Sequence, residues 1–198
     1  MTYNWSDTKS IGSYGYKCGH CDNNISSNSG YFTSNNIKTN DIIHQAGKIY
    51  ICHACNKPTF IDFVDDIKQY PGASFGSSVR YVTETGVDGI YQEARRCMSA
   101  NAPTASVLCC RKLLMHIAVA KKAPKGQTFV EYVQYLSDNG FVPPDAKGWV
   151  DHIRTKGNEA NHEITMMERK EAERLIQFCE ILLKIIYEFP ASVPKPKS

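Results

Sequence analysis

The sequence predicts an α+β protein in which a small N-terminal unit of short antiparallel strands precedes an all-α helical bundle. Two observations predict this division. Residues 16–63 combine two Cys-x-x-Cys pairs with runs of Asn, Ser, Thr and Gly, which favour turns and short strands over helix. Residues 87–189 carry apolar positions at helical spacing almost throughout. The predicted domains are a ribbon over 1–70, a linker over 71–86, a bundle over 87–189 and a disordered tail over 190–198.

The composition is that of an ordinary globular chain. Of the 198 residues, 42% are hydrophobic and 22% are charged, and the length fits one medium-sized domain or two small ones. The net charge of +3 lies entirely in residues 71–198, an excess too small to argue for nucleic-acid binding by itself. We find no run of about 18 apolar residues and no signal-like N-terminus. We therefore expect a cytoplasmic protein without a membrane span.

Three short segments of the N-terminal unit are predicted to be strands. Tyr16 and Lys17 lead into the first cysteine pair, residues 48–51 lead into the second, and residues 59–64 form a further apolar run. Residues 1–15 are polar and are expected to be loosely ordered. Residues 22–40 are expected to form turns and loops.

Five helices are expected in the second unit. Pro103 suits the first turn of the second helix, and Thr128 with Glu131 forms a capping box at the start of the third. Thr165 with Glu168 forms an equivalent box at the start of the fifth. The five segments are 88–100, 103–122, 128–139, 145–155 and 165–189.

Two of these helices have informative apolar patterns. The second is apolar almost all round, which predicts a central position in the bundle. The fifth carries one apolar stripe at helical spacing, made of Leu175, Phe178, Cys179, Leu182, Ile185, Ile186 and Phe189.

The two Cys-x-x-Cys pairs predict one zinc ion (Zn2+) per chain. Its ligands would be Cys18, Cys21, Cys52 and Cys55. Each pair presents two thiolates from a tight turn, and two such turns complete a tetrahedron with no open position, so we expect a structural metal. The spacer of 30 residues requires a long loop between the pairs. A redox dithiol, a rubredoxin-type iron site, and replacement of one cysteine by His20 or His53 are the alternatives.

The remaining cysteines and one Arg–His pair lie on predicted helices. We interpret the four cysteines on these helices as buried thiols; they are Cys97, Cys109, Cys110 and Cys179. Arg111 and His116 are five residues apart, which is about 500° of rotation, so we expect them to lie well apart around the second helix. A buried ion pair for Arg111 and a core or rim position for His116 are favoured over a catalytic role.

The densest polar cluster runs from His152 to His162, between the fourth and fifth helices. The start of a helix attracts phosphate, Arg154 could add a bidentate contact, and His162 could act as general acid or base. With Asn158, these residues form a candidate catalytic set for RNA cleavage through the 2′-hydroxyl. Chemistry alone favours the alternative, in which Asn158 caps a helix and His162 binds a buried partner.

These motifs together resemble the bacterial domain-of-unknown-function family 4145, over residues 16–188. The resemblance rests on the N-terminal cysteine pairs and on three helical motifs. These motifs are Glu93-Ala94 with Cys97, Arg111 with Leu114 and Ile117, and Arg154 with Gly157-Asn158, Ala160 and His162.

The resemblance implies a HEPN-like helical bundle, since that family is similar to the HEPN group of four-helix-bundle proteins. Many members of that group are ribonucleases in toxin–antitoxin, restriction and anti-phage systems. Their catalytic motif is an arginine, four to six residues, and a histidine. Here Gly157 stands where arginine is expected, and Arg154 gives a spacing of seven. The site is therefore either shifted by one helical turn or structural.

Three functions follow as hypotheses. We favour a zinc-binding, defence-associated binding or assembly module that contacts RNA, DNA or a partner protein. Aromatic residues of the ribbon could stack on bases, namely Tyr31, Phe32, Tyr50 and Phe60. The alternative is a metal-independent HEPN-type endoribonuclease that uses Arg154 and His162 across a homodimer cleft between two bundles. The third is a regulatory dimer without chemistry.

Overall fold

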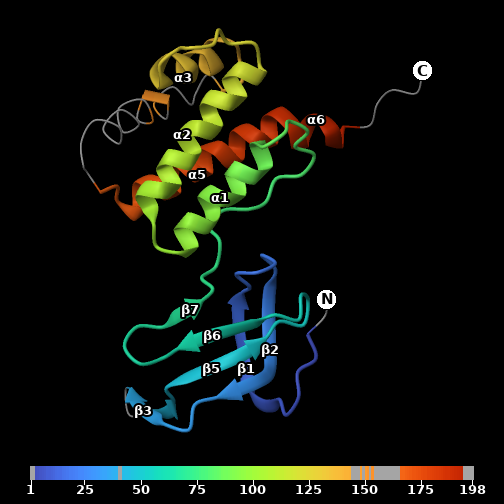
Figure 1. Ribbon diagram of the computed structural model, residues 1–198, viewed down its shortest axis with the longest axis vertical. Coiled ribbons are helices and arrows are strands. Elements are labelled where there is room, and N and C mark those ends of the chain that lie inside the picture. Colours follow the sequence, from blue (N-terminus) through green and yellow to red (C-terminus); the bar gives the residue numbers. More distant parts are fainter. Residues whose placement is uncertain are drawn as a thin grey trace. The chain divides into compact units, whose positions relative to one another are not determined.

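The computed structural model describes residues 3–39, 42–143, 148, 150–151, 153 and 166–193. The chain divides into two compact units, Met1–Ser74 and Phe75–Ser198. The first is built from antiparallel strands and the second from helices, as Figure 1 shows. The predicted α+β class, with strands first and helices after them, is confirmed.

The first unit contains a five-stranded antiparallel sheet in the order β1-β2-β5-β6-β7 (Figure 1). Its strands are β1 (Lys9–Lys17), β2 (Asn24–Phe32), β5 (Gly47–Ile51), β6 (Pro58–Asp62) and β7 (Lys68–Tyr70). A separate hairpin pairs β3 (Asn36–Thr39) with β4 (Ile42–Gln45). The strands expected before the second cysteine pair and near residue 60 are present as β5 and β6.

The two longest strands are β1 and β2. The strand expected at Tyr16 and Lys17 is the end of β1, whose earlier part was expected to be loosely ordered, and β2 lies where turns and loops were expected. The buried positions of β2 are Ile25, Ser27 and Gly30, so two of its three buried residues are small and give no apolar alternation in the sequence. Buried Ser27 is satisfied because its hydroxyl donates to the Ile51 carbonyl at 2.8 Å. The expectation of loops failed because residue type was weighed above period.

The second unit contains four longer helices within the described residues, one fewer than expected. These are α1 (Val87–Ser99), α2 (Pro103–Ala120), α3 (Phe129–Asp138) and α5 (Arg169–Leu183). A π-helix, η2 (Lys184–Glu188), and a short helix, α6 (Phe189–Ser192), continue α5. The helix expected over 145–155 falls mostly outside the described residues, of which 148, 150, 151 and 153 are helical. The predicted tail starts inside α6, and residues 194–198 lie outside the described set.

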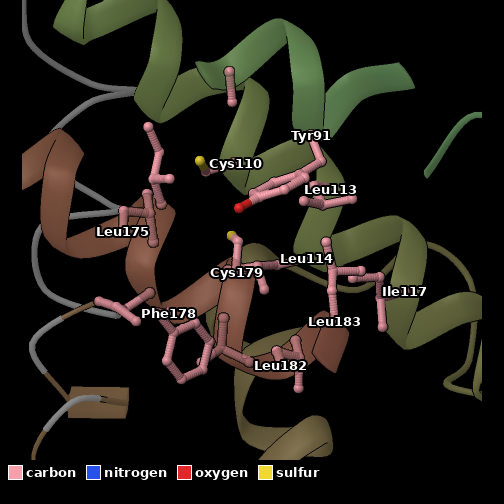
Figure 2. Close-up of a cluster of buried hydrophobic side chains, with 14 of the residues drawn as sticks. Tyr91, Cys110, Leu113, Leu114, Ile117, Leu175, Phe178, Cys179, Leu182 and Leu183 are labelled. Carbon is pink, nitrogen blue, oxygen red and sulfur yellow. The ribbon is translucent and has the colours of Figure 1, made fainter. Parts of the chain in front are cut away.

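Helix α2 occupies the centre of the helical unit, where it packs against α1, α3 and α5 (Figure 1). Leu113, Leu114 and Ile117 are fully buried on it, and Figure 2 shows them meeting side chains of α5. Among the helices of the described ranges, α2 is the one long and apolar enough to cross a membrane. Its place in the core accounts for that composition.

One predicted capping box is confirmed and the other is wrong. At the start of α3, the Thr128 hydroxyl accepts from the Glu131 backbone N–H, and the Glu131 carboxylate accepts from the Thr128 backbone N–H. Helix α5, however, begins at Arg169 with Glu168 as its N-cap residue. Residues 166–168 are not helical, and the Met167 N–H donates to the Thr104 hydroxyl on α2 at 3.0 Å.

The π-helix η2 alters the predicted apolar stripe of the last helix. Leu175, Phe178 and Leu182 are buried as expected. A π-turn holds about one residue more than an α-turn, so the pattern shifts after Leu183. Tyr187 then faces the core, while Phe189 is 56% exposed.

Residues 75–80, expected to be part of a linker, are bound to the helical unit as a strap. Arg95 of α1 is 2% exposed and donates to the carbonyls of Phe75 and Gly76 at 2.8 and 2.9 Å. The Glu180 carboxylate of α5 accepts from the Ser77 N–H at 2.8 Å. Gly76 has φ +69°, and a side chain there would collide with Glu180, which explains the glycine.

Candidate metal centre and other candidate sites

The four predicted zinc ligands come together in the first unit. Their sulfur atoms all lie within 4.8 Å of one another, and those of Cys18 and Cys55, and of Cys21 and Cys52, are 3.8 Å apart. A disulfide would need about 2.05 Å, so these are four free thiols. A zinc ion about 2.3 Å from each sulfur separates the sulfurs by about 3.8 Å. The spacing therefore fits a tetrahedral metal.

Both cysteine pairs form the same turn. Asp22 follows the first pair with φ 66°, and Asn56 follows the second with φ 57°, which is the left-handed conformation that Asp and Asn tolerate best. The N–H of each left-handed residue donates to the carbonyl of the first cysteine of its pair, at 2.9 Å for Cys18 and 2.7 Å for Cys52. This repeated geometry aims all four sulfurs at one point.

The surroundings of Cys18, Cys52 and Cys55 shift the pKa values of these thiols in different directions. Burial raises the pKa of Cys18, and burial together with the neighbouring thiols raises the pKa of Cys55 to about 12. For Cys52, backbone N–H bonds from Cys55 and Ala54 outweigh burial and lower the pKa. Thiolates crowded in a buried site need a cation to coexist, so the donor set fits zinc or another metal that accepts four sulfurs.

Neither histidine of the cysteine pairs belongs to the cluster. Among the described residues, the group that could hold a metal contains the four cysteines alone. The His20 Nε2 lies 2.9 Å from the Pro58 carbonyl oxygen, and His53 is exposed. The arrangement therefore argues against a histidine ligand, while iron would accept the same four sulfurs.

A row of aromatic side chains crosses the sheet on the face opposite its core. Directly paired residues share a face, and the register pairs Tyr31 with Ile49, Ile49 with Phe60, and Phe60 with Tyr70. The rings of Phe60 and Tyr70 stack with centroids 6.2 Å apart. Trp5 extends the row, with its ring 6.3 Å from that of Tyr31. We call Trp5, Tyr31, Phe60 and Tyr70 the aromatic row.

Two of the four residues expected to stack on bases are placed differently. Tyr50 is 2% exposed and packs in the core of the unit, so it is not available to a ligand. Phe32 is exposed, but it lies on the other face of the sheet from the aromatic row. It pairs with Lys48, which in turn pairs with buried Ile61. Sequence reasoning missed Trp5 and Tyr70, whose place depends on strand register and not on any local motif.

Arg111 and His116 were expected to lie well apart around the second helix, yet both line one pocket of about 450 Å3 on the α2–α3 side of the bundle. Arg111 makes no ion pair among the described residues; its guanidinium lies 4.2 Å above the centre of the Phe129 ring. His116 is exposed at the rim, as expected.

The segment with Arg154, Asn158 and His162 lies outside the described residues. Its catalytic and structural interpretations therefore both stay predictions. Of the four other cysteines, Cys110 and Cys179 are fully buried, as predicted, while Cys97 and Cys109 are partly exposed.

Comparison with known proteins places the helical unit in a family. No match was found among curated proteins or solved structures. The family model described as "Domain of unknown function (DUF4145)" matches residues 92–196, more than half of the chain, whereas the resemblance noted above extended over 16–188. The cysteine cluster lies before the matched range. The chain belongs to the DUF4145 family.

Proposed function

We propose that this protein is a zinc-stabilised, non-enzymatic module that binds single-stranded nucleic acid on the aromatic row. The observation that carries the proposal is the register of β2, β5, β6 and β7, which lines up Tyr31, Phe60 and Tyr70 on one sheet face. Bases of any sequence stack on such rings, with about 1–3 kcal/mol per base.

The metal centre supports the row rather than acting on the ligand. The Trp5 indole N–H donates to the Asn56 carbonyl at 3.0 Å, and the Asn56 side chain donates to the Tyr3 carbonyl. Asn56 is the left-handed residue that follows Cys55. A metal held by four cysteines has no open position for substrate, so its role is to fix the turn that positions Trp5.

The charge of the first unit sets the expected mode of binding. Residues 1–70 carry equal numbers of basic and acidic side chains. Lys68 lies on the face of the aromatic row, two residues before Tyr70, but Asp62 is its register partner. Few phosphates would be neutralised, so binding should depend on stacking and weaken only gently with salt.

Fluorescence anisotropy with labelled single-stranded and duplex oligonucleotides tests the proposal. Tyr70→Ala should weaken single-strand binding about tenfold or more. Tyr81→Ala is a matched control, because Tyr81 is 55% exposed in the helical unit and Tyr70 is 54% exposed. Absence of binding, or equal losses in the two variants, would reject nucleic acid as the ligand; a protein that co-purifies only with an intact row would instead indicate a protein partner.

The setting of this function is proposed from the family resemblance alone. We propose a cytoplasmic, defence-associated protein that forms a homodimer through its helical unit. In the ribonuclease alternative, RNA would be cut without added metal to leave a 2′,3′-cyclic phosphate, and His162→Ala would abolish the cut. Light scattering for the dimer, and incubation of the labelled RNA with each protein in chelator, test these two points.

A further inference from the structure

A buried arginine with an unused donor lies in the wall of the pocket between α2 and α3. Arg111 is 5% exposed, and its Nη1 atom is buried without a hydrogen-bond partner among the described residues. Burial lowers the pKa of this guanidinium. A buried donor left unpaired on a charged group costs free energy, so an anion that reached this guanidinium would offset that cost.

The other polar side chains of the pocket point to the same kind of ligand. Lys112 and His116 line it from α2, and Lys125 lines it from the loop that follows. Among the residues that the structure describes, none of those lining the pocket is acidic. Arginine and lysine together are the usual protein partners of phosphate, with arginine supplying a fork of two donors and lysine a point charge.

The rest of the pocket is apolar and of the size of a small-molecule site. Leu108, Met115 and Val119 lie on the same face of α2 as Arg111, and Tyr132 of α3 faces them. The volume of about 450 Å3 lies within the range of sites for small organic ligands. Free phosphate would leave this apolar wall unused, whereas an aromatic or aliphatic body attached to phosphate would cover it.

We propose that this pocket binds a small phosphate monoester with an apolar or aromatic body, the class that includes nucleoside monophosphates. The phosphate lies against Arg111, Lys112 and Lys125, and the body lies against the apolar wall. The pocket belongs wholly to the helical unit, so this proposal stands independently of nucleic-acid binding by the first unit.

Isothermal titration calorimetry and thermal unfolding of the full chain test the proposal. The probes are a nucleoside monophosphate, the matching nucleoside, inorganic phosphate and a 5′-phosphorylated oligonucleotide. The monophosphate should bind and raise the melting temperature, inorganic phosphate should bind at least tenfold more weakly, and the nucleoside should not bind. Tighter binding of the oligonucleotide than of the monophosphate would identify a nucleic-acid end as the source of the phosphate.

Two variants and a control separate a binding role of Arg111 from a structural one. Arg111→Met keeps the length of the side chain and should remove monophosphate binding. Lys125→Glu changes an exposed loop residue and should weaken binding at least tenfold without changing the melting temperature of the free protein. Lys170→Ala, in the exposed first turn of α5, should bind like the original chain.

Two results would overturn the proposal. One is the absence of heat and of a thermal shift with every phosphate probe at millimolar concentration. The other is a shift that is equal in the original chain and in both pocket variants, because a general effect of anions on a basic protein does not depend on these two side chains.

Discussion

The two units of this protein reach stability by different means. The core cluster of the first unit contains three aliphatic side chains, those of Ile11, Ile25 and Ile61, and two of its most buried residues are the candidate ligands Cys18 and Cys52. The second unit has an extensive core of Leu, Ile, Val and Phe side chains from α1, α2, α3 and α5. Figure 2 shows the part of this core where side chains of α2 and α5 meet Tyr91 of α1. The four cysteines in a small core fit a unit that a bound metal would stabilise, whereas the second unit has a core large enough to be stabilised by packing.

The two units also differ in which groups would compensate a buried charge. In the first, a bound metal would balance the charge of Cys18, Cys21, Cys52 and Cys55 as thiolates, whose sulfur atoms lie within 4.8 Å of one another. In the second, the Arg95 guanidinium is satisfied by carbonyls of the strap.

Metal removal should give the largest effect. With a strong chelator, the amides of β5 and β6 should lose their protection from hydrogen exchange, while those of α2 should keep theirs. The reason is that metal-binding free energy is folding free energy for a small domain. Hydrogen exchange followed by NMR or mass spectrometry measures both units at once. Loss of protection in α2 as well would contradict the comparison.

Metal analysis provides the control for this prediction. Protein purified without added metal should contain about one equivalent of zinc per chain. Cys52→Ser should lose it, whereas Cys97→Ser should retain it. Stoichiometric iron in place of zinc would favour the rubredoxin-type alternative.

Breaking the strap should give the second largest effect, confined to the helical unit. Arg95→Met removes the buried guanidinium that donates to the carbonyls of Phe75 and Gly76, and should cost about 3 kcal/mol of unfolding free energy. Arg96→Met, at the exposed neighbouring position of α1, should cost less than about 0.5 kcal/mol. Urea unfolding followed by circular dichroism compares the two. Equal costs would mean that residues 75–80 are only a linker.

Acidification should give the smallest loss of stability, through the contact between Glu180 and the Ser77 N–H of the strap. Burial alone would raise the pKa of Glu180, but hydrogen bonds from Lys184 and from the Ser77 N–H lower it below the ordinary value. A carboxyl with a lowered pKa in the folded state stabilises above its unfolded pKa of about 4.3, and this stability is lost as the pH falls further. The melting temperature of the helical unit should therefore decline on acidification below that value.

Substitution of the carboxyl checks the assignment. Glu180→Gln should flatten the acid dependence of melting, measured between pH 3 and 6, that is, about one to two units either side of 4.3. Glu173→Gln, on the same helix but paired with Arg169 rather than with the strap, should leave it in place. An acid dependence unchanged in Glu180→Gln would show that other carboxyls carry it.

Features set by local sequence could be predicted, and features set by distant pairing could not. The cysteine pairs, the Thr128 capping box and the central position of α2 each depend on a few neighbouring residues, and all were found. The aromatic row depends on the register between strands far apart in sequence. The strap depends on Arg95, which looks like an ordinary surface arginine on a helix until its burial is known.

Two errors concern the last helix. It begins at Arg169, later than its capping box indicates, and the Met167 N–H before that start donates to Thr104 of α2. Its apolar stripe fails near the end because the π-turn changes the residue period, which a fixed period of 3.6 cannot follow. One local signal was overlooked, since Asp22 and Asn56 directly after the cysteine pairs mark left-handed turns.

The strap has a practical consequence for anyone who cuts this protein into fragments. The family match begins at Gln92, so a fragment that starts there would lack residues 75–86, which include the strap, and the first five residues of α1. Arg95 would then lose the carbonyls of Phe75 and Gly76 that accept from it. The fragment would also lack Tyr91, whose hydroxyl donates to the Ser77 carbonyl. Expression of the helical unit alone should begin at Phe75, seventeen residues before the boundary that sequence similarity suggests.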